Sequence, residues 1–143
     1  MGIGLAAKPY GGAAGGGFME AGYNVAIVGL GRVGTFFLER LLKHANEGIR
    51  ITAVVEMRDT PGKLRAQEEG IPIYTLGELS DHSENLDLIF ELTGSLNVRA
   101  QLKSDLALAG NSRTIVVPET VAHFISCLLG EGCLPDVHPD KGF

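Results

Sequence analysis

The chain has 143 residues, which is enough for one domain with a buried core. Its composition, 45% hydrophobic and 20% charged, is ordinary for a globular protein. The formal net charge of −5, with no cluster of Lys and Arg to offset it, argues against nucleic acid and anionic membranes as partners. No apolar run approaches the ~20 residues of a membrane span and no secretory signal opens the chain, so a cytoplasmic protein is expected.

Three segments follow one another along the sequence. Residues 1–22 are rich in Gly and Ala without periodicity, and we expect a flexible leader. Residues 23–130 alternate apolar strand-like runs with amphipathic helices, which predicts one α/β domain. Residues 131–143 are a short tail.

The first predicted strand, residues 24–29, leads into Gly29-Leu30-Gly31-Arg32-Val33-Gly34. GxGxxG between a strand and a helix is typical of a dinucleotide-binding turn, where unpaired helix amides face a pyrophosphate. Gly29 would allow the turn, Gly31 would let phosphate approach the backbone, and Gly34 would let the helix lie close to its strand.

The helix after this turn, about residues 32–46, stacks Val33, Phe37 and Leu41 at four-residue spacing, and Phe36 is expected to widen that core-facing stripe. The second strand, residues 50–56, ends in Glu56, an acid at the position that accepts hydrogen bonds from the adenosine ribose. Its carboxylate would repel a 2′-phosphate, so we expect NAD rather than NADP. Arg58 keeps NADP open, because its guanidinium suits either the adenine face or a 2′-phosphate.

The middle of the chain contains a helix, two strands and a second glycine turn. Asp59-Thr60-Pro61 predicts a helix start, with an N-cap followed by proline, and the helix ends near Gly70. The third and fourth strands are predicted at 71–74 and 86–91. Thr93-Gly94-Ser95 then opens another helix, either touching the ribose or nicotinamide or, through Ser95 or Asn97, simply capping the helix.

The last part of the domain repeats the alternation. A helix with one apolar face is closed by Gly110, and a fifth strand is predicted at 113–117. A final helix is closed by Gly130. The expected core-facing residues of these two helices are Val98, Leu102 and Leu106, then Val121, Phe124, Ile125 and Leu128.

Strand and helix alternation at these lengths predicts right-handed crossovers and a three-layer α/β fold. We expect a Rossmann-like parallel sheet in the order 3-2-1-4-5, with helices on both faces. Ligands of such sheets bind at the carboxyl ends of the strands, where the order switches between strands 1 and 4. That rule points to the glycine turn, to Glu56 and to the Thr93–Ser95 turn.

The sequences VAIVGLGRVG, VVE and LDLIFELTGS resemble the dinucleotide domain of homoserine dehydrogenases, dihydrodipicolinate reductases and glucose–fructose oxidoreductase-type enzymes. The resemblance covers about residues 23–129 and implies an NAD(P)-binding Rossmann domain. The candidate cofactor contacts that it implies are Gly29, Gly31, Arg32, Val33, Gly34, Glu56, Thr93, Gly94 and Ser95.

Two features depart from that family. Homoserine dehydrogenases carry a functional lysine after the fifth strand, whereas residues 116–122 here read VVPETVA. These enzymes also append a substrate domain, and the chain ends shortly after Leu129. We therefore expect cofactor binding without a catalytic residue of this chain's own.

The His and Cys residues do not indicate a catalytic or metal-binding site. The histidines are scattered, and His123 within the last helix is more simply a surface or half-buried residue than a general acid. The Asp81–Glu84 stretch reads as a solvated turn and Glu91 as a strand-end residue. Cys127 and Cys133 lack the spacing of a zinc site and are expected to be inert thiols, so no metal is predicted.

Three functions are compatible with these features. The first is a nucleotide-binding or sensing module, in which NAD occupancy alters contacts with another protein, another domain or a second copy. The second is the cofactor-binding domain, truncated or completed by a partner, of an NAD(P)-dependent oxidoreductase. The third is a structural domain, or one that binds CoA or adenylate. An exposed sheet edge or an uncovered docking face would favour self-association, as a two-fold dimer.

Overall fold

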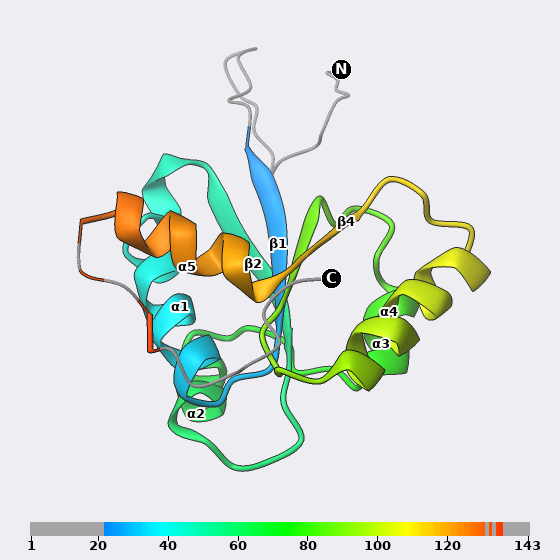
Figure 1. Ribbon diagram of the computed structural model, residues 1–143, viewed down its shortest axis with the longest axis horizontal. Coiled ribbons are helices and arrows are strands. Elements are labelled where there is room, and N and C mark those ends of the chain that lie inside the picture. Colours follow the sequence, from blue (N-terminus) through cyan, green and yellow to red (C-terminus); the bar gives the residue numbers. More distant parts are fainter. Residues whose placement is uncertain (1–21, 131, 133, 136–143) are drawn as a thin grey trace.

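Four short parallel strands form the centre of the structure (Figure 1). The computed structural model describes residues 22–130, 132 and 134–135. In sheet order the strands are β2 (Ile49–Val55), β1 (Tyr23–Val28), β3 (Leu88–Glu91) and β4 (Ile115–Val117). The helices are α1 (Arg32–Leu42), α2 (Pro61–Glu68), α3 (Leu76–Asp81), α4 (Leu96–Leu108) and α5 (Glu119–Leu128), with a short 3₁₀ helix η1 (Ala45–Glu47).

The predicted α/β fold with a parallel sheet is confirmed, and the strand order is the predicted one without the third predicted strand. That segment, residues 71–74, is reduced to a single bridge between Ile73 and Val54 on the open edge of β2. Val54 donates to the Pro72 carbonyl at 3.0 Å and accepts from the Tyr74 N–H at 2.8 Å. The ladder extends no further, because Pro72 has no N–H and Thr75 already caps α3.

The sheet separates two layers of helices. Along β1, Val25 and Ile27 face one buried cluster while Ala26 and Val28 face the other, as a period of two requires. The first cluster includes residues of α1, α2 and α5, and the second includes residues of α3 and α4. Figure 1 shows these two groups of helices on opposite sides of the strands.

Helix α1 is shorter than predicted and buries a different stripe. It ends at Leu42, and η1 and Gly48, at φ 90°, lead into β2. Its predicted core residues Val33, Phe37 and Leu41 are buried, but Phe36 is 47% exposed, so its predicted core role is wrong. The stripe widens instead toward Gly34 and Leu38, on the other side of the helix.

Two side-chain caps begin the next helices. Thr60 accepts the Lys63 N–H at 3.1 Å and is followed by proline, which is the predicted start of α2. Helix α3 was not predicted. It begins with a reciprocal capping box, in which Glu78 accepts the Thr75 N–H at 2.8 Å and Thr75 Oγ1 accepts the Glu78 N–H at 3.1 Å. The Thr-x-x-Glu spacing was the sequence signal for it.

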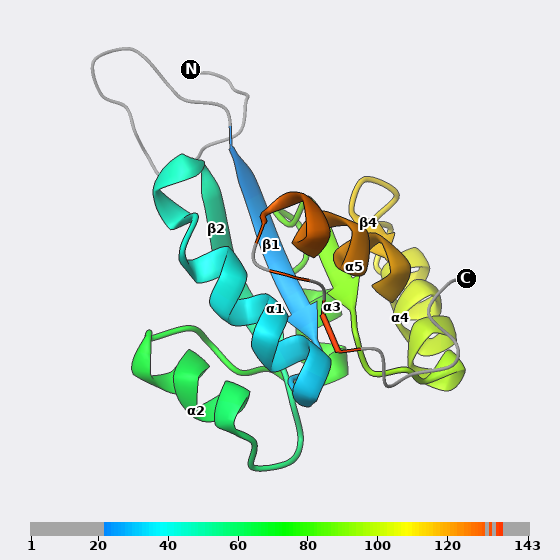
Figure 2. The same ribbon diagram turned by 60° about the vertical axis from the view of Figure 1, so that its left-hand side comes forward.

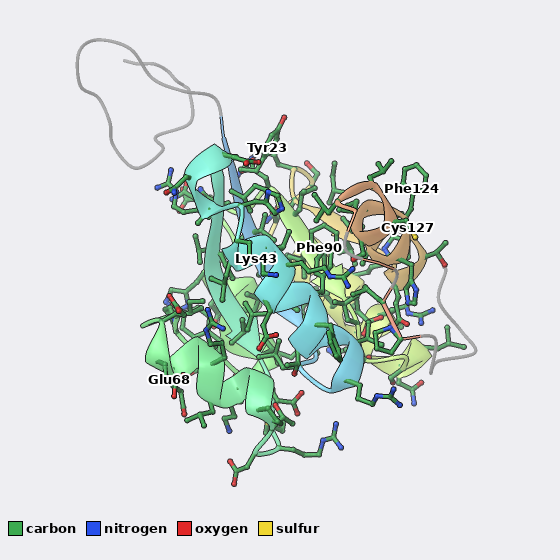
Figure 3. The ribbon with its side chains drawn as sticks, turned by 90° about the vertical axis from the view of Figure 1, so that its left-hand side faces the viewer. Tyr23, Lys43, Glu68, Phe90, Phe124 and Cys127 are labelled. Carbon is green, nitrogen blue, oxygen red and sulfur yellow. The ribbon has the colours of Figure 1, made fainter. Side chains whose placement is uncertain are left out.

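Helix α5 presents the opposite face to the one predicted. Val121, Phe124 and Leu128 are exposed, whereas Glu119, Ala122 and Ser126 are buried. Figure 3 shows Phe124 on the outer side of this helix. Two of these buried residues, Ala122 and Ser126, have small side chains, so this part of α5 lies close against the rest of the domain. The expectation of a core made from the large apolar residues is therefore wrong, apart from the partly buried Ile125.

Several sequence predictions concern the ends of the chain. The predicted leader up to residue 21, most of the predicted tail, Cys133 and His138 lie outside the described residues. Cys127 is described and is disulfide-bonded, so the expectation of a free thiol there is wrong. Within the described part of the chain, no helix has the length and apolarity that crossing a membrane requires.

Candidate functional site

Two glycines, Gly29 in the turn after β1 and Gly34 on α1, are required by the fold itself. Gly29 has φ 100°, and a Cβ there would lie 2.8 Å from Thr93 Cγ2 and 3.0 Å from the backbone of Leu92. A Cβ on Gly34 would lie 1.8 Å from the Gly29 carbonyl oxygen. Because both positions lack a Cβ, the glycine turn can lie against the β3–α4 turn, and α1 can lie close to the end of β1.

Gly31 has no comparable packing reason. A Cβ there would meet only Nη2 of Arg58, at an ordinary contact distance of 3.6 Å, and its φ is −77°. Gly31 is the N-cap residue of α1, and among the described residues no side chain caps this helix end. No side chain therefore stands in front of the first amides of α1 and the positive end of its dipole. This arrangement suits an anion.

Glu56 ties the end of β2 to the same turn. Its carboxylate is buried, with Oε1 accepting the Leu30 N–H at 2.6 Å and Oε2 accepting the Arg58 N–H at 3.0 Å. A carboxylate can accept about four hydrogen bonds, so acceptor positions remain for ligand hydroxyl groups. Glu56 thus shapes the glycine turn and keeps acceptor capacity beside it.

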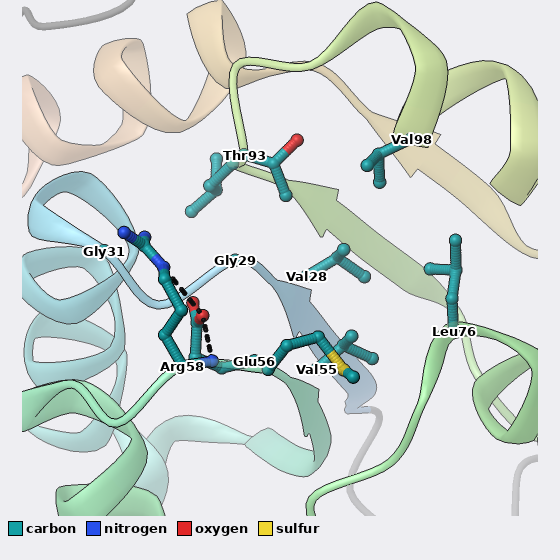
Figure 4. Close-up of a pocket in the computed structure, with 11 residues that line it drawn as sticks. Val28, Gly29, Gly31, Val55, Glu56, Arg58, Leu76, Thr93 and Val98 are labelled. Atoms are coloured by element: carbon teal, nitrogen blue, oxygen red, sulfur yellow. Dashed lines mark hydrogen bonds and ion pairs between the residues drawn. The ribbon is translucent and has the colours of Figure 1, made fainter.

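Arg58 contributes a positive charge at the rim. Its side chain is 76% exposed, with Nε 3.6 Å from Glu56 Oε2. Figure 4 shows the guanidinium extending toward Gly31. The cation therefore lies next to the glycine turn and the N-terminus of α1.

A buried ion pair sets the turn after β3. Arg99 Nε donates to Glu91 Oε1 at 2.7 Å, and the two side chains are 3% and 0% exposed. Glu91 Oε2 accepts from the N–H and the hydroxyl of Thr93, whose Oγ1 accepts the Ser95 N–H at 3.0 Å. Ser95 caps α4 by accepting the Val98 N–H. Glu91 is thus more than the predicted strand-end residue, because it positions Thr93.

A cavity of about 410 Å³ opens between these turns (Figure 4). Its polar rim consists of Gly29, Gly31, Glu56, Arg58 and Thr93. Its walls are apolar: Val28, Val55, Met57, Leu76, Leu92 and Val98. None of these apolar residues is among the site residues predicted from the sequence. For Val28 and Val55 the sequence did contain an indication, because the last residues of the first two strands must lie at the carboxyl edge of the sheet.

The other predicted contact residues take different places. Arg32 is exposed on α1, and Val33 and Gly34 are buried there, so from Val33 and Gly34 only backbone amides are near the helix end. Gly94 has φ 74°, which the β3–α4 turn requires. Ser95 is the N-cap of α4, one of the two roles considered for it.

The start of α5 holds a second buried carboxylate. Glu119 is fully buried, and its Oε2 lies 3.2 Å from Nε2 of His123, whose side chain is 16% exposed. This pair follows β4, in the segment where the resemblance implied a lysine. Within residues 22–130, 132 and 134–135, no group of three His, Cys, Asp or Glu residues could hold a metal ion.

Comparison with known proteins shows a likeness of structure and none of sequence. No family model matches the chain, and no curated protein sequence matches it. A Staphylococcus aureus homoserine dehydrogenase matches with a TM-score of 0.53 and 14% identity, over 78% of this chain and 31% of that one. A Lactobacillus casei scyllo-inositol dehydrogenase, solved with NAD(H) and scyllo-inositol, matches with a TM-score of 0.51 and 14% identity, over 78% and 34%.

A putative myo-inositol dehydrogenase of Sinorhizobium meliloti matches with a TM-score of 0.50 and 18% identity, over 75% of this chain and 32% of that one. The chain therefore spans about a third of the length of these dehydrogenases. At such identities the likeness establishes the fold, and the expected resemblance is confirmed at that level. The chain has the Rossmann-type fold that these dehydrogenases contain.

Proposed function

We propose that this chain is a nucleotide-binding module that takes a nicotinamide dinucleotide at the carboxyl edge of its sheet. Residues 23–130 would form the binding domain, and ligand occupancy would alter contacts with another protein, another domain or a second copy. The supporting fold is that of dehydrogenases, one of which was solved with bound NAD(H). The observation that carries the proposal is Gly31.

Gly31 is informative because the fold does not need it. Its position has neither the positive φ of Gly29 nor the backbone clash of Gly34. A glycine without a structural reason, at an uncapped helix N-terminus, is accounted for by a ligand that must come closer to the backbone than a Cβ allows. A pyrophosphate has the charge and the acceptor oxygens that this helix end favours.

The preference of this site is proposed to be NAD, with NADP as a weaker ligand. The buried carboxylate of Glu56 is held beside the glycine turn by the Leu30 amide, where a ribose is expected. A 2′-phosphate there would meet a like charge. The exposed guanidinium of Arg58 would offset part of that repulsion, so the discrimination should be moderate.

A second copy is the proposed partner. On α5, Val121, Phe124 and Leu128 are exposed at 39%, 63% and 70% and share one helical face. The exposed positions of this helix carry no Asp, Glu, Lys or Arg, so two copies can approach without charge repulsion. Such a face is unusual on a monomer.

A second candidate function is the cofactor-binding domain of an NAD(P)-dependent oxidoreductase. The structural likeness to dehydrogenases favours it. Sedimentation velocity with and without saturating NAD separates the two candidates. A ligand-dependent shift in association supports the sensing module, whereas unchanged association favours the cofactor domain.

Calorimetric titration tests the binding itself, because the chain has no tryptophan to report it. NAD, NADH, NADP and NADPH are titrated into the wild type and into Gly31→Val and Gly77→Val. Gly77 is a matched control, since a Cβ there meets nothing within 4 Å, one on Gly31 meets only Arg58 Nη2 at an ordinary 3.6 Å, and Gly77 lies on α3 outside the cavity lining. We expect saturable binding in the wild type and in Gly77→Val, and loss of binding in Gly31→Val.

Glu56→Gln tests the preference between the two cofactors. The amide oxygen still accepts the Leu30 N–H, but the negative charge is gone, so the affinity for NADP should rise relative to NAD. A ratio that does not change would contradict the role assigned to the carboxylate. Absence of binding by all four dinucleotides in the folded wild type would refute the proposed function.

A further inference from the structure

We propose that two copies of this chain join at the open edge of β4, so that their four-stranded sheets become one continuous sheet around a two-fold axis. This inference rests on the second copy that is the proposed partner in the proposed function. It specifies the interface as the edge of β4 together with the exposed face of α5.

The backbone of β4 offers hydrogen-bonding groups at this edge. Among the residues that the structure describes, β4 is the last strand of the sheet and pairs with β3 alone. The Ile115 N–H donates to the Asp87 carbonyl, beside β3, at 3.0 Å. Successive backbone groups of a strand point to alternate sides, so those of Ile115 and Val117 face β3 and those of Val116 face outward. Val116 therefore presents one donor and one acceptor at the open edge.

These two groups are complementary to themselves. When a two-fold axis perpendicular to the sheet passes beside Val116, the two strands run antiparallel, and each Val116 N–H donates to the Val116 carbonyl of the other copy. The same register places Arg113 of one copy opposite Glu119 of the other, so the two Arg113 side chains lie at opposite ends of the contact. Because Pro118 has no N–H, the hydrogen-bonded contact is short, and apolar side chains must supply most of the affinity.

The face of β4 on the α5 side is apolar and uncovered. Val117 belongs to the buried cluster on that side, and Ile115, two residues earlier, faces the same way. Ile115 is nevertheless 60% exposed, because the described contacts of α5 are mainly with α1 and β3. Figure 2 shows α5 beside α1 on this side of the sheet. A second copy can therefore place apolar side chains against Ile115.

Helix α5 extends this apolar surface. It begins two residues after β4 ends, and its exposed face consists of Val121, Phe124 and Leu128. The strand itself reads Ile-Val-Val, without the charge that commonly keeps an edge strand from pairing. The edge of β4 and the α5 face thus form one continuous surface without a charged side chain of its own.

The edge is accessible from the α4 side as well. A groove of about 560 Å³ lies between α4 and β4, and Leu106, Ala107 and Val116 contribute to its lining. Lys103 is the charged residue of the described lining and is exposed, so its ammonium group can stay in water when the groove is covered. A strand of a second copy can therefore reach the backbone of Val116 without displacing a helix.

Hydrogen exchange of single backbone amides, followed by NMR at a low and a high protein concentration, tests the inference on the full chain. Sedimentation velocity identifies the concentrations at which monomer and dimer predominate. The Val116 N–H should exchange more slowly in the dimer, by a factor about tenfold larger than that for the Ile115 N–H. Ile115 is the internal control, because its bond to Asp87 is present in both states.

Ile115→Lys tests the apolar part of the same interface. It places a charge on the edge strand of both copies, and it should weaken dimerisation by about tenfold or more. Leu64→Lys is the matched control, because Leu64 is 55% exposed but lies on α2, whose described helix neighbour is α1. It should change the dimer dissociation constant less than about twofold. Circular dichroism establishes that both variants are folded.

Three results would overturn the inference. They are a monomer at every concentration, a dimer in which the Val116 N–H exchanges as fast as in the monomer, or Ile115→Lys dimerising as tightly as Leu64→Lys. The second result would leave α5 alone as the contact between copies. Calorimetry with NAD on the same samples reports nucleotide binding separately. A dimer with a protected Val116 N–H and no nucleotide binding would support the interface and refute the proposed function.

Discussion

Removing Arg99 should destabilise this domain more than removing any exposed arginine. Arg99 and Glu91 form a pair at 2.7 Å with 3% and 0% of their side chains exposed. In Arg99→Met the aliphatic volume is largely kept, but the carboxylate of Glu91 stays buried without its cation. Thr93 still donates to Glu91, yet its two hydrogen bonds do not supply a compensating charge.

The expected loss follows from the geometry. At 2.7 Å two unit charges attract by about 6 kcal/mol at an effective dielectric constant of ~20, and the desolvation of both groups offsets part of this. Removing one partner of a buried pair costs about 3–5 kcal/mol, out of a total stability of about 5–15 kcal/mol. With a slope of ~2 kcal/mol per molar, the urea midpoint should fall by about 2 M. Circular dichroism at 222 nm follows the transition.

Arg113 provides the matched control. Its Nη1 lies 2.7 Å from Asp87 Oδ1, the same separation, but its side chain is 52% exposed. Arg113→Met should therefore cost less than about 1 kcal/mol. The double variant Glu91→Leu/Arg99→Met should recover much of the loss, because no buried charge remains unpaired. If Arg99→Met and Arg113→Met cost the same, burial does not decide the energetics and the reasoning is refuted.

The other predictions concern the turn, a cap and the surface. Gly29→Ala should lower the free energy of unfolding by about 1–3 kcal/mol in urea, because φ is 100° and the new Cβ meets Thr93, whereas Gly77→Ala should lower it not at all. Thr75→Ala removes a capping box and should cost about 1 kcal/mol, visible as faster amide exchange over α3; unchanged exchange would count against it. Phe124→Asp should give a folded monomer in sedimentation velocity, and a persisting dimer would exclude α5 as the interface.

Local chemistry made much of the fold predictable. The strands of Val and Ile, the glycine turn and the Thr60-Pro61 start all act through neighbours in sequence, so the sheet and α2 were predicted close to their bounds. The segment at 71–74 was apolar enough for a strand, but Pro72 and the cap at Thr75 limit it to one bridge. Each residue by itself leaves a short strand possible, and only the two together limit the pairing to one bridge.

Helix α5 could not be predicted in the same way. Periodicity placed Val121, Phe124 and Leu128 on one face correctly, but which face is buried depends on what lies beside the helix. The neighbouring structure accepts the small residues Ala122 and Ser126 instead. The hydrophobic pattern therefore identified an apolar face of α5, but it did not predict whether that face is buried or exposed.

For the candidate site too, some features follow from the sequence and others only from the tertiary structure. The sequence by itself predicted the polar rim, Gly29, Gly31, Glu56, Arg58 and Thr93, because the glycine turn and the acid after the second strand stand at fixed distances along the chain. Only the tertiary structure decided that Gly31 is free of packing demands and that α3 and α4 supply an apolar wall. It alone showed that Glu91 is neutralised by Arg99. These properties depend on which distant segments meet, and spacing along one chain does not record that.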